Sequence, residues 1–203
     1  MTVLSATEIR RRMGLSTDPL VVSPLLEPNE QITDTQASVD LRLGCRFRIA
    51  QVTSEDVVDT LNGRRSAMAP LKYVSVGKSI VLHPHNLVLG ETLEFVRLPI
   101  NVAGYVVGRS SWGREGLVVA TAVGVHPGFA GPITLELRNL GEVPIRLYPG
   151  DLITQLFLHD VSGAPQPGPL TTSQFAGASG PNRGRHRYRE TEKKLHALGK
   201  KRQ

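Results

Sequence analysis

The densest group of polar residues in the chain is residues 108–116, Gly-Arg-Ser-Ser-Trp-Gly-Arg-Glu-Gly. The guanidinium groups of Arg109 and Arg114 can bind phosphate oxygens through paired hydrogen bonds. Ser110 and Ser111 add hydroxyl donors, and the glycines allow backbone N–H groups to approach an anion closely. A solvent-exposed loop with a structural Arg–Glu pair has the same composition. The residues alone therefore leave a phosphate site and an ordinary loop equally open.

Glu136 is the second feature that could do chemistry, because a carboxylate can take up and return a proton. Apolar and polar residues alternate around it: Ile133, Leu135 and Leu137 with Thr134, Glu136 and Arg138. This period of two predicts a strand with Glu136 on its polar face. An ordinary exposed glutamate, or one paired with Arg138, fits the same pattern.

Short apolar runs separated by turn residues fill the middle of the chain and must position these groups. They lie at residues 79–82, 87–95, 104–107, 117–121, 133–137, 145–147 and 152–158. Short strands at such regular spacing, with no long amphipathic helix between them, predict an all-β barrel or sandwich.

Two further elements are expected nearer the N-terminus. Ser5 and Glu8 fit a capping box, in which each side chain bonds to the backbone N–H of the other, so we expect a helix over residues 6–13. Residues 37–50 alternate between apolar and polar. This pattern predicts a half-buried strand, or a strand pair bent near Gly44.

Composition restricts the classes of function. Cys45 is the only cysteine among 203 residues, which excludes disulfide scaffolds, Cys-rich zinc sites and CxxC redox chemistry within one chain. We expect Cys45 to be buried in a strand. His83 and His85 flank a proline, so we expect turn residues there and not a metal-binding pair. The sequence has no apolar run near the ~18–20 residues of a membrane helix and no signal-peptide pattern, so we expect a cytoplasmic protein.

The net charge of +6 at pH 7 belongs to the C-terminal tail. Residues 183–203 contain nine Lys or Arg and two Glu, and the remainder of the chain is close to neutral. Before this basic segment the chain is rich in Gly, Pro and Ser, and a helix is expected around residues 189–198. We therefore expect a β domain over residues 1–161 and a lid with a basic tail over residues 162–203.

Several longer stretches resemble a known family. GRSSWGREGL, TAVGVHPGFAGPITLELRNLG and PGDLITQLFL, preceded by ASVDLRLGCRFRI and LHPHNLVLGETLEFVRLP, resemble the dCTP deaminase branch of the trimeric dUTPase superfamily. The resemblance implies a distorted β-barrel or jelly roll (the dUTPase-like β-clip), assembled as a homotrimer with active sites between subunits. It also implies conversion of dCTP to dUTP and ammonia without zinc, with magnesium carried by the triphosphate. Zinc deaminases need an H-x-E and P-C-x-x-C signature, which one cysteine cannot supply.

The resemblance also implies roles for individual residues. Glu136 would be the general base that activates a water for attack on C4 of cytosine, and Ser110 and Arg114 would orient that water and the base. The nucleotide-binding set would comprise phosphate-facing residues (Arg109, Ser110, Ser111 and Gln155), residues facing the base, sugar or water (Arg114, Ala122, His126, Thr134 and Glu136) and lid residues (Gln174 and Phe175).

Two parts of the chain depart from the family pattern. His126 stands where the family has an Asp that contacts the deoxyribose 3′-hydroxyl. In the lid, Gln174, Phe175 and Ala178 replace a Lys, a Tyr and a Gln, so one cation and several hydrogen bonds are missing. We expect the arginines within residues 183–187 to replace the lost charge on the phosphates.

The sequence leaves other functions open. One is a dUTPase-like or bifunctional nucleotide pyrophosphatase, although the absent Asp at position 126 counts against it. Another is a catalytically altered member that binds nucleotides without turnover, which the changed lid would fit. A third is nucleic-acid binding through the basic tail, which we do not expect because the charge does not extend over the β domain. A solvated tail or an intersubunit strap fits that segment better.

Overall fold

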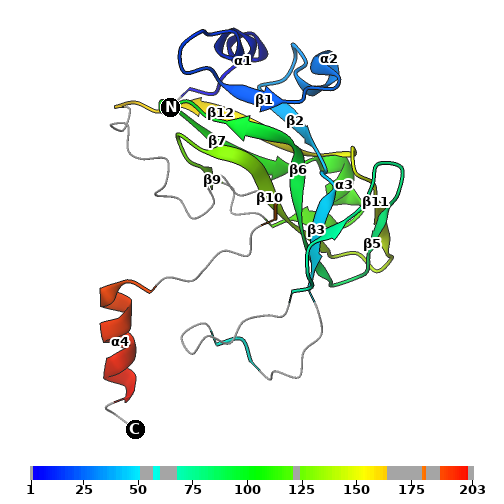
Figure 1. The fold of residues 1–203 in the computed structure, drawn as a ribbon, viewed down its shortest axis with the longest axis vertical. Coiled ribbons are helices and arrows are strands. Elements are labelled where there is room, and N and C mark those ends of the chain that lie inside the picture. Colours follow the sequence, from blue (N-terminus) through cyan, green and yellow to red (C-terminus); the bar gives the residue numbers. More distant parts are fainter. Residues whose placement is uncertain are drawn as a thin grey trace.

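Short antiparallel strands dominate the structure, a computed structural model that describes residues 2–50, 57–59, 68–120, 124–163, 180–181 and 188–200 (Figure 1). The strands are β1 (Val21–Ser23), β2 (Ser38–Arg42), β3 (Arg46–Ile49), β4 (Lys72–Tyr73), β5 (Ile80–Leu82), β6 (Leu87–Arg97), β7 (Val102–Gly108), β8 (Leu117–Val119), β9 (Gly124–Val125), β10 (Ala130–Asn139), β11 (Ile145–Leu147) and β12 (Leu152–Asp160). The helices are α1 (Ala6–Met13), α2 (Pro28–Gln31), α3 (Ser110–Arg114) and α4 (Glu190–Lys200). The prediction of a mainly β chain is confirmed.

The described strands pair into three sheets. The largest has the order β4-β3-β6-β10-β8, with β1 also paired to β6; the second has the order β2-β12-β7-β9, and the third joins β11 to β5. Side chains from all three enter one buried cluster, in which Phe47, Leu135 and Leu156 are fully buried. The described part of the chain is therefore a sandwich of sheets around one core and not a closed barrel.

All seven predicted apolar runs correspond to observed strands, namely β5, β6, β7, β8, β10, β11 and β12. In β10, Ile133 and Leu135 are buried while Thr134 and Glu136 are half-buried, which confirms the predicted alternation. β10 also begins earlier than the apolar run, because Ala130 continues the backbone pairing with β6. Backbone pairing needs no apolar side chain, so the sequence pattern marks the buried part of a strand better than its ends.

The N-terminal helix is confirmed as α1, with Gly14 at its C-cap. The hydroxyl of Ser5 accepts a hydrogen bond from the backbone N–H of Glu8 at 3.3 Å. The Glu8 carboxylate does not complete the predicted capping box, because it accepts from Arg11 and Arg12 at 2.7 Å each. These bonds lower the pKa of Glu8 to about 2. Two guanidinium groups one turn away hold the carboxylate more strongly than a single backbone N–H would.

Residues 37–50 form the predicted bent pair, β2 and β3, with Gly44 between them. A Cβ at Gly44 would lie 3.0 Å from two backbone oxygens of β6, so the close approach requires glycine here. One expectation is wrong. Cys45 is only half-buried, because it lies in the bend outside the strand pairing. Asp40, on the polar side of β2, is 1% exposed, because other side chains cover that face.

The predicted C-terminal helix is confirmed as α4. The predicted turn at His83 and His85 is confirmed too, since the backbone N–H of Asn86 donates to the His83 oxygen at 3.2 Å. Within the part of the chain that the structure describes, no helix has the length and apolar character needed to cross a membrane.

Candidate active site

Asp40 joins two of the predicted nucleotide-binding residues. Its carboxylate is 2% exposed and uses both oxygens: Oδ1 accepts from Nε2 of Gln155 at 2.9 Å, and Oδ2 from Nη1 of Arg109 at 2.8 Å. Asp40 and Gln155 are direct partners across β2 and β12. β7, which leads into Arg109, pairs with the other edge of β12. The strand order of the four-stranded sheet therefore brings these three side chains together.

A buried polar network fixes Asp40 in turn. Nε2 of Gln31 donates to the backbone oxygen of Asp40 at 3.0 Å and to Oε1 of Glu94 at 2.8 Å. The backbone N–H of Arg42 donates to Oε2 of Glu94 at 2.9 Å. Gln31 and Glu94 are fully buried. Since shifting β2 against β6 would break these bonds inside the core, the direction of the Asp40 carboxylate is set by the fold.

Arg109 keeps donors available for a ligand. Its side chain is 30% exposed, and the ion pair with Asp40 uses one nitrogen of a guanidinium that has five N–H donors. Its backbone N–H donates to the oxygen of Ile153 at 3.0 Å, which fixes the start of the following helix. A guanidinium held at the surface by a buried carboxylate is well suited to bind phosphate oxygens.

Helix α3 follows immediately and carries Ser110, Ser111 and Arg114, all of which are exposed. Its anchor is Trp112, whose Nε1 donates to the backbone oxygen of Leu152 at 2.9 Å. The anchor holds α3 against β12, the strand that also carries Gln155. The structure thus places the predicted hydroxyl groups directly after the Arg109 guanidinium in a fixed segment.

Glu136 and Thr134 lie on the outer face of the six-stranded sheet, away from the core that contains Leu135. Across the strand pair with β6, Glu136 faces Leu89 and Thr134 faces Glu91. Glu136 is half-buried, and this burial raises its pKa above the ordinary value. A raised pKa brings a carboxylate closer to the range in which it exchanges protons at neutral pH.

The structure does not bring α3 and Glu136 together within one chain. Leu137 of β10 pairs with Val119 of β8, and both pack on the core. Val119 also lies against the end of β7, because a Cβ at Gly108 would be 3.4 Å from its Cγ2. Helix α3 starts two residues after Gly108, and its Trp112 packs against the same core. Because successive strand residues point to opposite faces, Glu136 points away from α3.

The remaining predicted site residues are less informative. His126 is exposed in the turn between β9 and β10, where its backbone oxygen accepts from the N–H of Phe129 at 3.1 Å. Ala122, Gln174 and Phe175 lie outside the described residues, as do the arginines within 183–187. Their proposed roles stay predictions.

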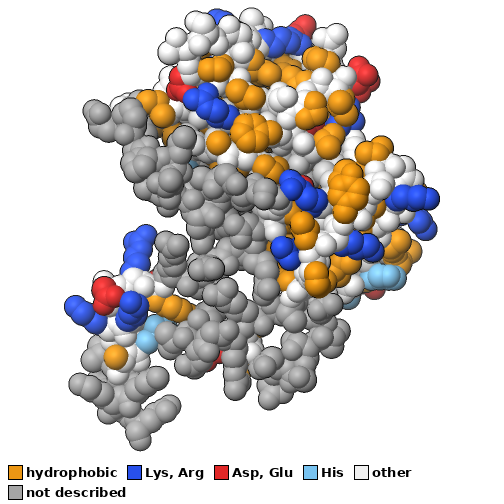
Figure 2. All heavy atoms as spheres, in the orientation of Figure 1, with side chains coloured by type: hydrophobic (Ala, Val, Ile, Leu, Met, Phe, Trp, Pro, Cys, Tyr) orange, Lys and Arg blue, Asp and Glu red, His pale blue; other side chains and the backbone are white. Residues whose placement is uncertain are grey.

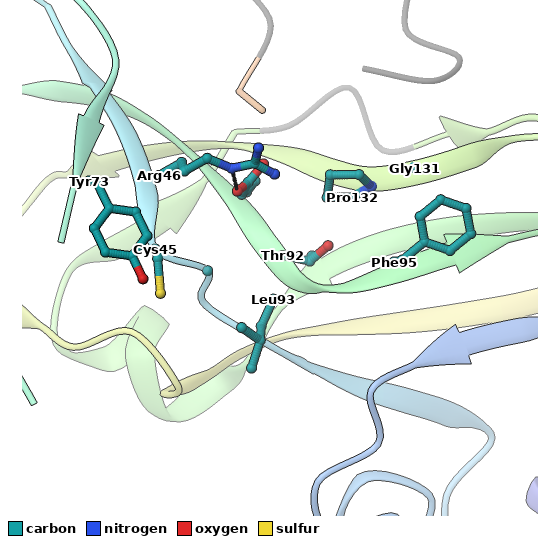
Figure 3. Close-up of a pocket in the computed structure, with 10 residues that line it drawn as sticks. Cys45, Arg46, Tyr73, Thr92, Leu93, Phe95, Gly131 and Pro132 are labelled. Carbon is teal, nitrogen blue, oxygen red and sulfur yellow. Dashed lines mark hydrogen bonds and ion pairs between the residues drawn. The ribbon is translucent and has the colours of Figure 1, made fainter. Parts of the chain in front are cut away.

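The outer face beside Thr134 and Glu136 is hollowed by a cavity of about 490 Å³. In Figure 3, Tyr73 and Cys45 lie at one end of this cavity and Phe95 at the other. Its wall contains a buried carboxylate, Glu91, paired with the guanidinium of Arg46 in β3. Burial raises the pKa of Glu91, and the Arg46 charge opposes that effect. The cavity therefore adjoins the strand surface on which Glu136 lies.

Asp40 is the functional residue that sequence reasoning missed. The only signal was a single carboxylate inside an otherwise hydrophobic and basic strand pattern, which reads equally as a surface position. Its partner Gln155 is 115 residues away, so no local spacing connects the two. Only the pairing of β2 with β12 makes the relation visible.

All of the contacts around Asp40, Arg109 and Gln155, and the strand with Glu136, fall within residues 3–161, which match the family model described as dCTP deaminase-like. The chain belongs to the dCTP deaminase-like family. The resemblance inferred from the motifs is thereby confirmed.

Individual relatives of this dCTP deaminase-like chain agree with the family match. A "dCTP deaminase, dUMP-forming" of Dictyoglomus thermophilum is 40% identical over 161 residues, which are 79% of this chain and 81% of that protein. A "dCTP deaminase" of Natronomonas pharaonis is 40% identical over 187 residues, 90% of this chain and 94% of that protein. Among solved structures, the 2′-deoxycytidine 5′-triphosphate deaminase of Agrobacterium tumefaciens matches with a TM-score of 0.57 and 23% identity. That match covers 77% of this chain and 46% of the other, and it supports the fold alone.

Proposed function

We propose that this dCTP deaminase-like chain hydrolyses dCTP to dUTP and ammonia. The observation that carries the proposal is the half-buried carboxylate of Glu136, with its raised pKa, on β10, the strand for which the family resemblance implies a general base. The names of the relatives support dCTP as the substrate. The guanidinium of Arg109, held by Asp40, supports the recognition of a phosphate chain.

In the proposed reaction, Glu136 takes a proton from water while the water oxygen bonds to C4 of cytosine, and the carboxyl group then gives that proton to ring nitrogen N3. The C4–N bond then breaks as the hydroxyl proton passes by way of Glu136 to the amino group. Ammonia leaves, and a C4 carbonyl remains. Ser110 and Arg114 orient the water and stabilise the charge that develops during the addition.

The triphosphate, in this proposal, binds at Arg109, Ser110, Ser111 and Gln155, and magnesium arrives on its oxygens. Across the described ranges, the structure shows no group of three or more His, Cys, Asp and Glu side chains arranged to hold a metal ion. Magnesium carried by phosphates needs few protein ligands. We accordingly assign no side chain to it.

Zinc chelation is expected to leave the activity unchanged. The zinc deaminases hold their metal with at least two cysteines, and this chain contains one. The protein would be incubated with 1,10-phenanthroline, separated from the chelator, and assayed for ammonia release with magnesium and dCTP. A loss of rate that added zinc restores would contradict zinc-independent catalysis.

A second copy of the chain completes the site in our proposal, within a homotrimer. The opposite orientation of α3 and Glu136 supports this arrangement, because the two must meet at one substrate. Large hydrophobic side chains are also exposed, including Phe95, Tyr105 and Val107, at 39–45% of their surface. Figure 2 shows such side chains lying between Lys and Arg residues on the visible face of the β sheets. Exposed apolar surface of this kind is typical of subunit contacts.

Mixing two inactive variants is expected to restore deamination. Glu136→Gln subunits retain an intact α3, and subunits with Ser110→Ala and Arg114→Gln retain Glu136. If the variants assemble at random in equal amounts, about one quarter of the intersubunit sites combine both intact parts. Ammonia release should reach a similar fraction of the wild-type rate. No recovery, in oligomers shown by mass spectrometry to be mixed, would contradict a shared site.

The acidic limb of the pH–rate profile is expected at a higher pH than for an exposed glutamate. Burial raises the pKa of Glu136, and only its ionised form can take a proton from water. Activity should therefore rise as pH increases through this pKa, above the value of about 4.3 for a free glutamate side chain. Measuring kcat for ammonia release as a function of pH tests this. An acidic limb at the pKa of a free glutamate would show that Glu136 does not carry out the rate-limiting proton transfer.

Product analysis tests the function itself and separates it from a second candidate. The name "dUMP-forming" of the Dictyoglomus relative favours a bifunctional enzyme that also removes pyrophosphate. The protein would be given dCTP, CTP, dCMP or dUTP, with ammonia and pyrophosphate measured separately. Ammonia with accumulating dUTP supports the proposal, and pyrophosphate with dUMP supports the bifunctional candidate. Tight binding of dCTP without release of either product would overturn both.

A further inference from the structure

A bulge in the pairing of β6 with β10 accompanies the cavity beside Glu136. The strand register shifts between Pro132 and Thr134, and the extra residues of the bulge belong to β6. The hydroxyl of Thr92 bridges the gap, because it accepts a hydrogen bond from the backbone N–H of Ile133 at 2.9 Å. The bulge is therefore a fixed part of the sheet. Bulges of this kind change the direction of nearby side chains and are common beside active sites.

The carboxylate of Glu91 lines this cavity and has one unused oxygen. Its side chain is only 4% exposed, and Oε1 accepts from the guanidinium of Arg46 across β3 and β6. In Figure 3 the Arg46 guanidinium lies between Tyr73 and Pro132, with this ion pair drawn as a dashed line. Oε2 of Glu91 has no hydrogen-bond partner among the residues that the structure describes. An unpaired buried carboxylate oxygen costs free energy, so a donor group of a ligand would be stabilised at this atom.

The strand register places Glu91 next to the proposed general base. Thr134 is the direct partner of Glu91 across β6 and β10, and Glu136 lies two residues further along β10 on the same face. Directly opposite residues in such a pair have Cβ atoms about 5 Å apart, and diagonal neighbours lie about 7–8 Å apart. Two carboxylates at this separation can reach adjacent atoms of one pyrimidine ring. If Glu136 acts at C4, Glu91 lies within reach of the group that C4 carries.

The charge of Glu91 suits only one kind of group at C4. In the ion pair with Arg46 the carboxylate is ionised, so it accepts hydrogen bonds and donates none. Cytosine carries an amino group on C4, which donates, whereas thymine and uracil carry a carbonyl oxygen there, which accepts. Oε2 of Glu91 would therefore bind the amino group and repel the carbonyl oxygen. The apolar side chains of Leu93 and Phe95 in the cavity wall offer surface for the face of the ring.

We propose that Glu91 is a specificity-determining residue: its Oε2 accepts a hydrogen bond from the 4-amino group of a cytosine nucleotide and disfavours nucleotides that carry a carbonyl at C4. The position of the base beside Glu136 rests on the proposed function. The unpaired oxygen, the cavity and the strand register do not depend on it. Because deamination replaces the amino group by a carbonyl, the same carboxylate also favours release of the product.

Calorimetric titration of Glu136→Gln protein tests this role without turnover. The ligands are the α,β-imido analogues of dCTP and dUTP, whose bridging nitrogen resists the loss of pyrophosphate. The dCTP analogue is expected to bind more tightly than the dUTP analogue. Adding Glu91→Gln should reduce the ratio of the two dissociation constants at least about tenfold. The reason is that a glutamine amide can donate to a C4 carbonyl as well as accept from an amino group.

The matched control adds Glu142→Gln instead, because Glu142 is exposed between β10 and β11, and the ratio should not change. A purely structural role of Glu91 would weaken both analogues equally, and an unchanged ratio would overturn the proposal. If Glu91→Gln does not fold, the comparison is repeated with Arg46→Gln added, which leaves no unpaired charge. A preference for the dCTP analogue that Glu91→Gln removes would support the proposal even if the wild-type chain releases no ammonia, in which case the proposed function alone fails.

Discussion

Glu136→Gln is expected to reduce the rate of ammonia release from dCTP by at least about a thousandfold, a loss of about 4 kcal/mol of transition-state stabilisation. The amide has nearly the shape of the carboxylate but cannot take a proton from the attacking water. Since Glu136 lies on the half-buried outer face of β10, the substitution removes no contact from the core. Folding and nucleotide binding should persist. Single-turnover ammonia release and calorimetric titration with dCTP measure the two properties separately.

The matched control for this variant is Glu142→Gln. Glu142 is an exposed glutamate in the turn that follows β10, so the same change of charge occurs away from the site. Its turnover should equal that of the wild type. Normal turnover in Glu136→Gln would remove Glu136 from the mechanism, whereas loss of binding together with turnover would show that its main role is to hold the substrate.

Asp40→Asn is expected to weaken both the fold and the binding of the triphosphate. The carboxylate accepts from Gln155 and Arg109 through different oxygens, so the amide of Asn must direct its NH₂ group at one of these donors. The change also leaves the Arg109 guanidinium without its buried counter-charge. Removing one partner of a buried ion pair costs about 3–5 kcal/mol, and we expect a loss near the lower end of that range because Arg109 is partly exposed. KM for dCTP should rise at least about tenfold.

Urea unfolding measures the loss of stability, provided that the dependence of the unfolding free energy on urea concentration has the same slope as in the wild type. Ammonia assays at varied dCTP concentration measure KM. Asp34→Asn is the control, because Asp34 is 82% exposed and pairs with Arg10 at the surface. If Asp40→Asn does not fold, Gln155→Ala removes one donor while leaving the Asp40–Arg109 ion pair. It should raise KM with a smaller change in stability. Wild-type stability and KM in both variants would contradict the role assigned to Asp40.

Much of the fold could be predicted because its determinants are local. The alternation from Ile133 to Leu137 marks β10, since a strand with one buried face must repeat every two residues. The hydroxyl of Ser5 marks the start of α1, because the first backbone N–H groups of a helix need an acceptor. Arg109, Ser110 and Glu136 could be singled out because phosphate binding and proton transfer each require particular functional groups.

The features that the sequence did not predict depend on which chain segments meet. Asp40 belongs by its pattern to a polar face, but Arg109 and Gln155 cover it, and they arrive from strands far along the chain. Cys45 continues the apolar alternation, yet the bend at Gly44 takes it out of the strand. Glu8 had a cap partner three residues away, and two arginines outcompeted it. In each case the type of the residue was informative, but the sequence did not show which residue it would contact.

The sequence by itself determined the strand content, the N-terminal helix, the family and the identities of the groups able to do chemistry, because these follow from side-chain types and short spacings. The tertiary structure decided two further points: that a buried Asp40 holds Arg109 and Gln155, and that Glu136 points away from the core against which Trp112 of α3 packs. Each depends on strand order and register between segments far apart in the sequence. Those are set by packing of the whole core, which no local pattern encodes.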